Sequence, residues 1–166
     1  MNTIQDQPSL RLLLRHREKF PPSDLECSQG LHALLEHLQF EAMSKAFRPH
    51  GGFVSGDDVM HRLRRLVQQP ASTLERWLAS RKVLNVWWRD QTLMPMFQFD
   101  LENMTVRPAC ARVVDELKAV FDDWELTLWF ATPNTWLNGM APVTLLTRDD
   151  VQVLQAARAD RFVCRG

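Results

Sequence analysis

FVSGDDVMHRLRRLVQQPASTLERWLASRKVLNVWWRDQTLMPMFQF, residues 53–99, is the stretch that decides the expected fold. Ser55, followed three residues later by an aspartate, approximates a capping box and predicts a helix that begins near Asp57. A Gln-Gln-Pro-Ala segment then breaks that helix. Ser72 and the glutamate three residues after it form a second capping box, which predicts a short helix through about Ser80. The stretch therefore predicts two short helices joined by a turn.

Two β-rich runs follow these helices, at residues 83–88 and 93–99, on either side of a polar turn. Such a pair is typical of a β-hairpin. Because proline cannot donate to a strand ladder, Pro95 would confine the second strand to an edge or to a short pairing. Two helices followed by a hairpin are the layout of a winged helix-turn-helix, so we expect such a unit in residues 51–100.

The regions on both sides are expected to be helical. Residues 1–50 read as an N-terminal helical extension, in which apolar residues recur at helical spacing through residues 30–47. This amphipathic helix would pack either on its own domain or on a copy of itself, and the pattern leaves both open. Residues 101–166 read as an all-α C-terminal domain. The fold class is thus mainly α: a helix-turn-helix with a small β-hairpin wing, then an all-α C-terminal domain.

Local signals place the helices of the C-terminal domain. Pro108 fits a first helical position. Asp122 or Asp123 can cap the next helix, and Pro142 can open a short turn. Thr147, with an aspartate three residues on, forms a third capping box and predicts the start of the last helix.

Composition limits the class of protein. The chain has 166 residues, a net charge of zero and 45% hydrophobic residues, as expected for a globular protein. We expect no membrane association, because no apolar run approaches the length that spans a bilayer. The first ten residues lack the basic start and apolar core of a secretion signal. Three scattered cysteines indicate reduced thiols, so we expect a cytoplasmic protein.

The neutral net charge hides a basic segment at residues 61–82, where six Lys and Arg residues stand against one Glu, a net +5. Such a segment suggests a polyanion partner, although a solvated surface is the alternative. The second helix of a helix-turn-helix offers side chains to the major groove, while the first helix and the wing hold phosphates. The predicted DNA-binding residues are therefore Arg62, Arg65, Ser72, Thr73, Arg76, Arg81, Lys82 and Arg89.

WFATPNTWLNGMAPVTLL, residues 129–146, combines turn formers with large apolar side chains. Prolines and a glycine would fix a corner between helices, which lowers the ordering entropy lost when a partner binds. Aromatic anchors of this kind are what interface hot spots use. The alternative is that these side chains merely pack the corner onto the core. The predicted partner-binding residues are Trp129, Asn134, Trp136, Leu137, Asn138, Gly139 and Leu145.

Catalytic and metal sites find no support in the sequence. The histidines share no ligand spacing with one another or with a cysteine. The Gly-rich phosphate loops and the nucleophilic-serine motif are absent from the sequence. We therefore expect no catalytic residues, no metal and no cofactor.

The order of several motifs resembles the Xre/MbcA/ParS-type antitoxins, over about residues 52–162. The matching marks run along the chain as Pro95-x-Phe97-Gln98-Phe99-Asp100, Pro108, Trp124, Trp129-Phe130, and Pro133-Asn134-x-x-Leu137-x-Gly139-x-x-Pro142-x-x-Leu145-Leu146. The resemblance implies a C-terminal domain that binds a partner toxin, usually a RES-fold enzyme that consumes NAD. It also implies repression of the protein's own operon.

Two functions from different classes follow. The first is a non-enzymatic antitoxin-like protein that binds a toxin, binds DNA as an autoregulator and forms a homo-oligomer. The alternative is a solitary DNA-binding transcription regulator without a cognate toxin.

Overall fold

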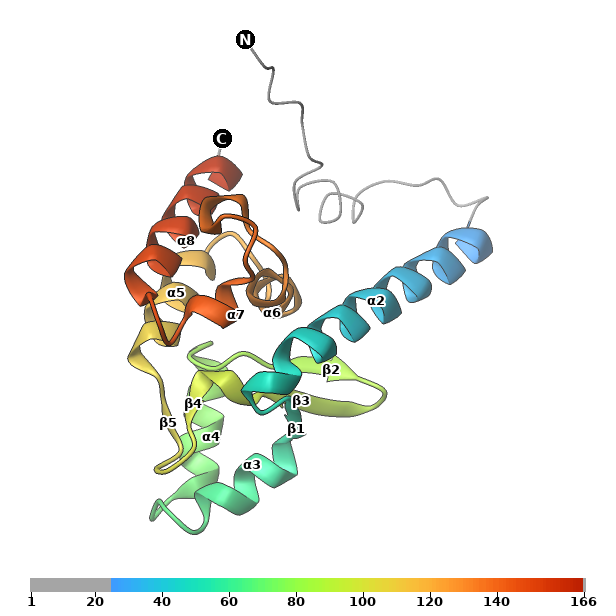
Figure 1. The fold of residues 1–166 in the computed structure, drawn as a ribbon. Helices are drawn as coiled ribbons and strands as arrows, with labels where there is room; N and C mark the ends of the chain where they lie inside the picture. The colour runs from blue at the N-terminus through green and yellow to red at the C-terminus, as the bar shows by residue number, and fades with distance from the viewer. Residues whose placement is uncertain (1–24, 166) are drawn as a thin grey trace. The chain divides into compact units, whose positions relative to one another are not determined.

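The structure is a computed structural model that describes residues 25–165, so the first half of the predicted N-terminal extension lies outside the described residues (Figure 1). The chain divides into two units, residues 1–38 and 39–166. Within the described residues the protein is mainly helical with a small antiparallel sheet, which confirms the coarse fold class.

Helix α2 (Leu25–Phe47) is the longest helix of the described chain. Its last turns bury Met43 and Phe47 completely. A 3-10 turn, η3 (Arg48–His50), and Gly51 in the left-handed region end it. A Cβ atom on Gly51 would lie 2.8 Å from the Cβ of Met96, so glycine is required here by both φ and space.

The sheet has the strand order β1-β3-β2, with antiparallel pairing throughout. Strands β2 (Val86–Trp88) and β3 (Gln91–Pro95) form the predicted hairpin. Arg89 and Asp90 turn it with positive φ angles of 46° and 64°, as two-residue hairpin loops require.

Strand β1 (Phe53–Ser55) is a finding that the sequence patterns did not indicate. It pairs with β3, so β3 is the central strand. Of the two expected alternatives the edge position was wrong, while the short pairing is confirmed, with three residue pairs to each neighbour. Pro95 is tolerated because it is the last residue of the strand, opposite Phe53, where the ladder ends.

Helices α3 (Gly56–Leu63) and α4 (Pro70–Ala79) start differently from each other. The hydroxyl of Ser55 accepts the backbone N–H of Asp58 at 3.1 Å, which confirms the first predicted cap. The predicted cap at Ser72 is wrong, because α4 already begins at Pro70 and Ser72 is its third residue. Proline has a φ suited to the first helical turn and lacks the N–H that would otherwise need a cap.

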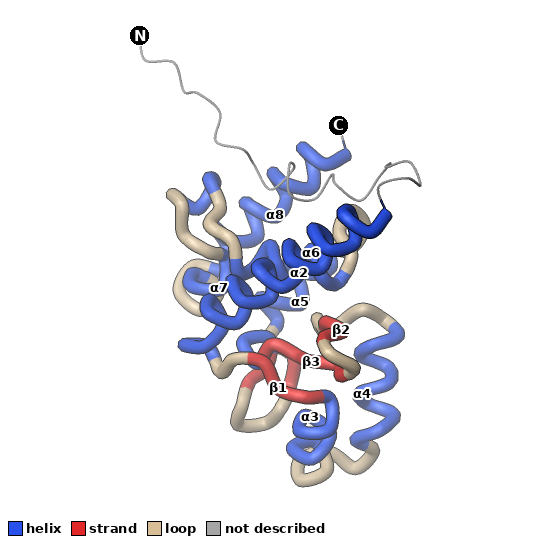
Figure 2. The backbone as a smooth tube through the Cα atoms, turned by 90° about the vertical axis from the view of Figure 1, so that its right-hand side faces the viewer, coloured by secondary structure: helices blue, strands red, loops and turns tan. Residues whose placement is uncertain are grey.

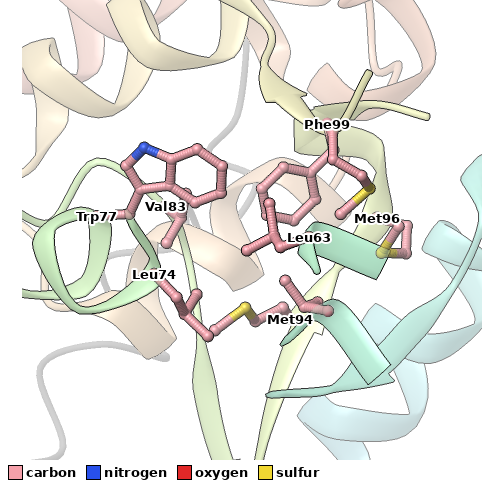
Figure 3. Close-up of a cluster of buried hydrophobic side chains, with 9 residues drawn as sticks. Leu63, Leu74, Trp77, Val83, Met94, Met96 and Phe99 are labelled. Carbon is pink, nitrogen blue, oxygen red and sulfur yellow. The ribbon is translucent and has the colours of Figure 1, made fainter. Parts of the chain in front are cut away.

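A cluster of buried side chains joins α3 and α4 to the strands (Figure 3). Trp77 of α4 lies against Phe99, with ring centroids 5.8 Å apart. The members of the cluster are Val59, Leu63, Leu74, Trp77, Val83, Met94, Met96, Phe99 and Met104. Figure 2 shows the three strands between α3 and α4 on one side and the C-terminal helices on the other. Burial of this cluster fixes which sides of α3 and α4 face solvent.

The C-terminal part begins with η4 (Met96–Gln98) and a two-stranded ladder of β4 (Phe99–Asp100) and β5 (Thr105–Val106). The ladder corrects the expectation that this region is all helix. The helices that follow are α5 (Pro108–Leu117), α6 (Asp123–Ala131), η5 (Thr135–Leu137), α7 (Pro142–Leu145) and α8 (Asp150–Arg165).

Most predicted helix starts in this part are confirmed. Pro108 and Pro142 open α5 and α7, and Asp122 forms a full capping box with Glu125 at the start of α6. The cap predicted at Thr147 is wrong. Asp149 directly precedes α8, and its carboxylate accepts the N–H of Gln152 at 3.0 Å, which leaves no role for the threonine.

Candidate functional site

The C-terminal end of α3 and the turn after it carry exposed arginines, whereas the first turn of the helix carries the exposed Asp57 and Asp58. Val59 and Leu63 are completely buried, so the helix turns the predicted residues Arg62 and Arg65 to solvent. Arg64 is also exposed beside them. Three guanidinium groups therefore lie on or just after α3 without burial.

Helix α4 presents a second set of predicted residues. Leu74 and Trp77 face the core, and Ser72 and Arg76 are exposed on the other side. Thr73 is half-buried, and its N–H is already used by the carbonyl of Gln69 at 3.0 Å. The exposed polar side chains of α4 are thus the predicted Ser72 and Arg76 together with Glu75, and Ser72 lies inside the helix rather than at its cap.

The hairpin adds a cation and an exposed aromatic ring. The guanidinium carbon of Arg89 lies 5.8 Å from the ring centre of Trp88. Trp88 itself stacks on Phe40 at 4.3 Å, which fixes the hairpin to the end of α2. Trp87 points to the opposite side of the strand and is 65% exposed. Sequence reasoning did not select Trp87, although strict alternation along β2 would have placed it outside.

Lys82 and Arg81, which follow α4, differ in their surroundings. Lys82 is exposed, but the guanidinium of Arg81 is engaged within the protein. Its Nε donates to Asp123 at 2.8 Å, Nη1 to the carbonyl of Lys118 at 2.7 Å and Nη2 to that of Phe121 at 2.9 Å. All three nitrogens therefore have partners, and Arg81 joins α4 to the segment between α5 and α6 instead of facing outward.

The backbone of Arg81 also has an unusual conformation. Its φ is +49°, directly after the C-cap of α4, where glycine is the common residue. The N–H of Lys82 reaches the carbonyl of Trp77 at 2.9 Å, as in a Schellman motif. A non-glycine residue in this conformation costs about 1 kcal/mol, which the guanidinium contacts offset.

The corner between α6 and α7, residues 132–141, is organised by one carboxylate, that of Asp160 on α8. Its Oδ2 accepts Trp129 Nε1 and Asn134 Nδ2, both at 2.7 Å, and its Oδ1 accepts Trp136 Nε1 at 3.2 Å. Asn134 also caps η5, because its Oδ1 accepts the N–H of Trp136 at 2.9 Å. A single acid thus fixes the indole of Trp129 on α6 and, within the corner, the amide of Asn134 and the indole of Trp136.

Five of the predicted partner-binding residues divide into a buried group and an exposed group. Trp129, Leu137 and Leu145 are buried, so for these three the core-packing alternative describes their position. Asn138 and Gly139 are exposed and form the turn, with φ angles of 54° and 78°.

Trp136 is 55% exposed and is the remaining aromatic candidate, with the exposed Met140 nearby in sequence. Its indole is held by Asp160 while more than half of its surface faces solvent. The corner therefore presents a ring that is already oriented.

Asp160 was missed by sequence reasoning, and a signal for it exists. Val153, Ala156 and Ala157 are the buried residues of α8. Asp160 lies seven, four and three residues after them, respectively, on the same side of the helix. An acid in an apolar stripe needs a polar partner inside the fold.

The titratable groups of the described residues show two clear shifts. Burial raises the pKa of the Cys110 thiol to about 12, so this cysteine is a neutral core residue. Burial, and secondly the charge of Arg148, lower the pKa of His50. Within residues 25–165, no group of three or more His, Cys, Asp or Glu side chains is arranged to hold a metal ion.

A cavity of about 410 Å³ lies beside β5 and the start of α8, with Asp100 and Asp150 in its lining. Both acids have partners. Asp150 pairs with Arg112, and Asp100 accepts the N–H of Glu102 at 3.0 Å. Asp100 is thus held by its own turn, and Asp150 by an arginine of α5.

Comparison of the chain with protein-family models, with curated proteins and with solved structures finds no match. In the part of the chain that the structure describes, helices long and apolar enough to traverse a bilayer are not found. The two surfaces described above are the features of the molecule that bear on its function.

Proposed function

We propose that this chain is a non-enzymatic, antitoxin-like protein that binds duplex DNA and a protein partner through separate surfaces. One observation carries the DNA-binding part. The order α2-β1-α3-α4-β2-β3, with the strand order β1-β3-β2, supports the proposal of a winged helix-turn-helix-like unit, and α3, α4 and the hairpin carry exposed cations.

In this proposal the exposed side of α4 enters the major groove. This side carries Ser72 near the N-terminus of the helix and Arg76 in its last turn. Phosphates are bound by Arg62 and Arg65 on the α3 side, by Lys82 after α4, and by Arg89 in the hairpin turn. Trp87, exposed on the same hairpin, adds an apolar contact at the edge of the groove. Arg81 is left out of the surface, since its guanidinium is occupied.

The protein partner is proposed to bind at Trp136. The resemblance to antitoxins suggests a toxin, of RES type, and the exposed, oriented indole supports an interface of this kind. DNA binding combined with toxin binding is what autoregulation of an operon requires.

Electrophoretic mobility shifts with the protein's own upstream DNA test the DNA-binding part. Arg65→Ala should weaken binding to all sequences and reduce the slope of log K against log salt by about one unit. Arg76→Ala should relax sequence choice by about 1–3 kcal/mol at one base pair, if its contact is bidentate. Arg148→Ala removes an exposed arginine between α7 and α8 and serves as the control, with affinity unchanged.

Failure of the intact protein to shift this DNA at low salt would contradict the proposal. If the three variants lose affinity equally, binding depends on net charge alone, and the assignment of α4 to the groove is wrong.

A further inference from the structure

A stripe of leucines on α2 belongs to neither of the two surfaces above. Leu31, Leu34 and Leu38 are 67%, 53% and 53% exposed. Their spacing of three and four residues places them on one side of the helix. Large apolar side chains gathered in this way mark an interaction surface rather than isolated exposure.

The opposite side of the same helix is already used by the protein's own fold. Successive helical residues are rotated by about 100°, so residues nine apart lie on opposite sides. Leu31, Leu34 and Leu38 stand nine residues before Phe40, Met43 and Phe47 respectively. Met43 and Phe47 are completely buried, and Phe40 stacks on Phe53 at 5.4 Å. The leucines therefore lie on the side of α2 opposite to the apolar residues of its last turns.

The sequence of the stripe is close to a palindrome. Residues 31–38 read LHALLEHL, in which the leucines and histidines recur in the same order from either end. Two antiparallel copies, related by a twofold axis between residues 34 and 35, would place Leu31 on Leu38 of the second copy. Leu34 would then meet Leu35 of the second copy. A twofold interface needs a patch that is complementary to itself, and this segment has that property.

The polar residues of the segment fit the same pairing. His32 and Glu36 contact each other along the helix, with Nε2 and Oε1 3.1 Å apart, and so flank the stripe. The twofold arrangement sets Glu36 opposite Ala33 of the second copy instead of opposite another acid. Like charges directly across the axis are thereby avoided.

We propose that residues 31–38 of α2 form an antiparallel, twofold helix pair with a second copy of this chain. The proposal depends on α2 alone and is independent of DNA binding. Its consequence for a DNA-binding protein is that each particle carries two basic faces.

Light scattering on the full chain, at concentrations of about 1–100 µM, measures the mass of the particle. We expect twice the chain mass for the parent protein. The double variant Leu31→Gln with Leu38→Gln should dimerise roughly 100-fold more weakly, because the Leu31–Leu38 contact is lost at each end of the pair. The double variant Leu66→Gln with Leu101→Gln is the control and should remain dimeric, since each of these leucines is 49% exposed elsewhere.

Orientation is tested by a spin label at Ala42, in a background with Cys27→Ser and Cys164→Ser. The two labelled sites are about 22 Å apart along the axis in the antiparallel pair, from a rise of about 1.5 Å per residue. A parallel pair would bring them to the helix separation of about 8–10 Å.

Three outcomes would overturn the proposal. One is a monomer throughout the concentration range, and another is a label distance below about 15 Å. The third is a double variant Leu31→Gln with Leu38→Gln that melts at a lower temperature with its mass unchanged. That result would mean that the same copy covers the stripe.

Discussion

The corner at residues 132–141 and the end of α4 are positioned by opposite means. At the corner, one carboxylate, Asp160, collects three N–H donors from Trp129, Asn134 and Trp136. At the end of α4, one guanidinium, Arg81, collects a carboxylate and two backbone carbonyls. Each region thus depends on one charged side chain that binds groups distant in sequence.

The two regions also leave a similar feature at the surface, an exposed tryptophan beside a fixed framework. Trp136 is 55% and Trp87 is 65% exposed. The difference lies in how the rings are held. Trp136 donates its indole N–H to Asp160, while Trp87 is placed by strand alternation alone. The hydrogen bond on the ring itself, and not its exposure, therefore distinguishes the oriented Trp136 from Trp87.

The largest effect is expected inside the corner, at Leu137. This side chain is completely buried, so Leu137→Ala should lower the free energy of unfolding by about 2–5 kcal/mol. Trp136→Ala should lower it by less than about 1 kcal/mol and weaken partner binding 30- to 1000-fold, a loss of about 2–4 kcal/mol. Thermal melting and a pull-down of the partner on both variants check these values.

Equal melting of the two variants, or partner binding unaffected by Trp136→Ala, would contradict the division of the corner into a buried and a presented residue.

A smaller effect is expected at Asp160. Asp160→Ala leaves the buried Trp129 N–H and the amide of Asn134 without their acceptor, which should cost about 2–3 kcal/mol. The melting temperature should fall by roughly 5–10 °C. Indole fluorescence should also report a more mobile Trp136. Asp149→Ala, which removes only a helix cap, is the control, with a loss of about 1 kcal/mol.

If Asp149→Ala destabilises the protein more than Asp160→Ala, then Asp160 does not organise the corner.

The smallest effect is expected at Arg81. Arg81→Ala should lower stability by about 1–2 kcal/mol, because the side chain is partly exposed and the loss of its contacts is offset in part by water. DNA affinity of the folded variant should be unchanged. Urea denaturation and mobility shifts on the same preparation separate the two roles, and Arg76→Ala gives the contrasting pattern of retained stability and changed sequence choice.

Unchanged stability together with a loss of DNA binding in Arg81→Ala would restore the sequence-based interpretation of this residue as a DNA contact.

The sequence by itself determined the features that depend on near neighbours. Ser55 and Asp122 cap helices, Pro108 and Pro142 open them, and residues 86–95 form a hairpin. These features are readable because a cap, a proline or a two-residue turn acts within about four residues of itself. Ser72 shows the limit, since two signals two residues apart compete there and Pro70 defines the start.

Tertiary structure alone decided the pairing of β1 with β3 and the roles of Arg81 and Asp160. Arg81 contacts residues 37, 40 and 42 positions away, and Asp160 accepts donors 24, 26 and 31 positions away. A basic residue beside a predicted recognition helix has the same local pattern whether it faces DNA or a carboxylate of its own chain. Which partner it binds depends on how the helices pack, because the free energy of a charged hydrogen bond depends on the burial and spacing that packing creates.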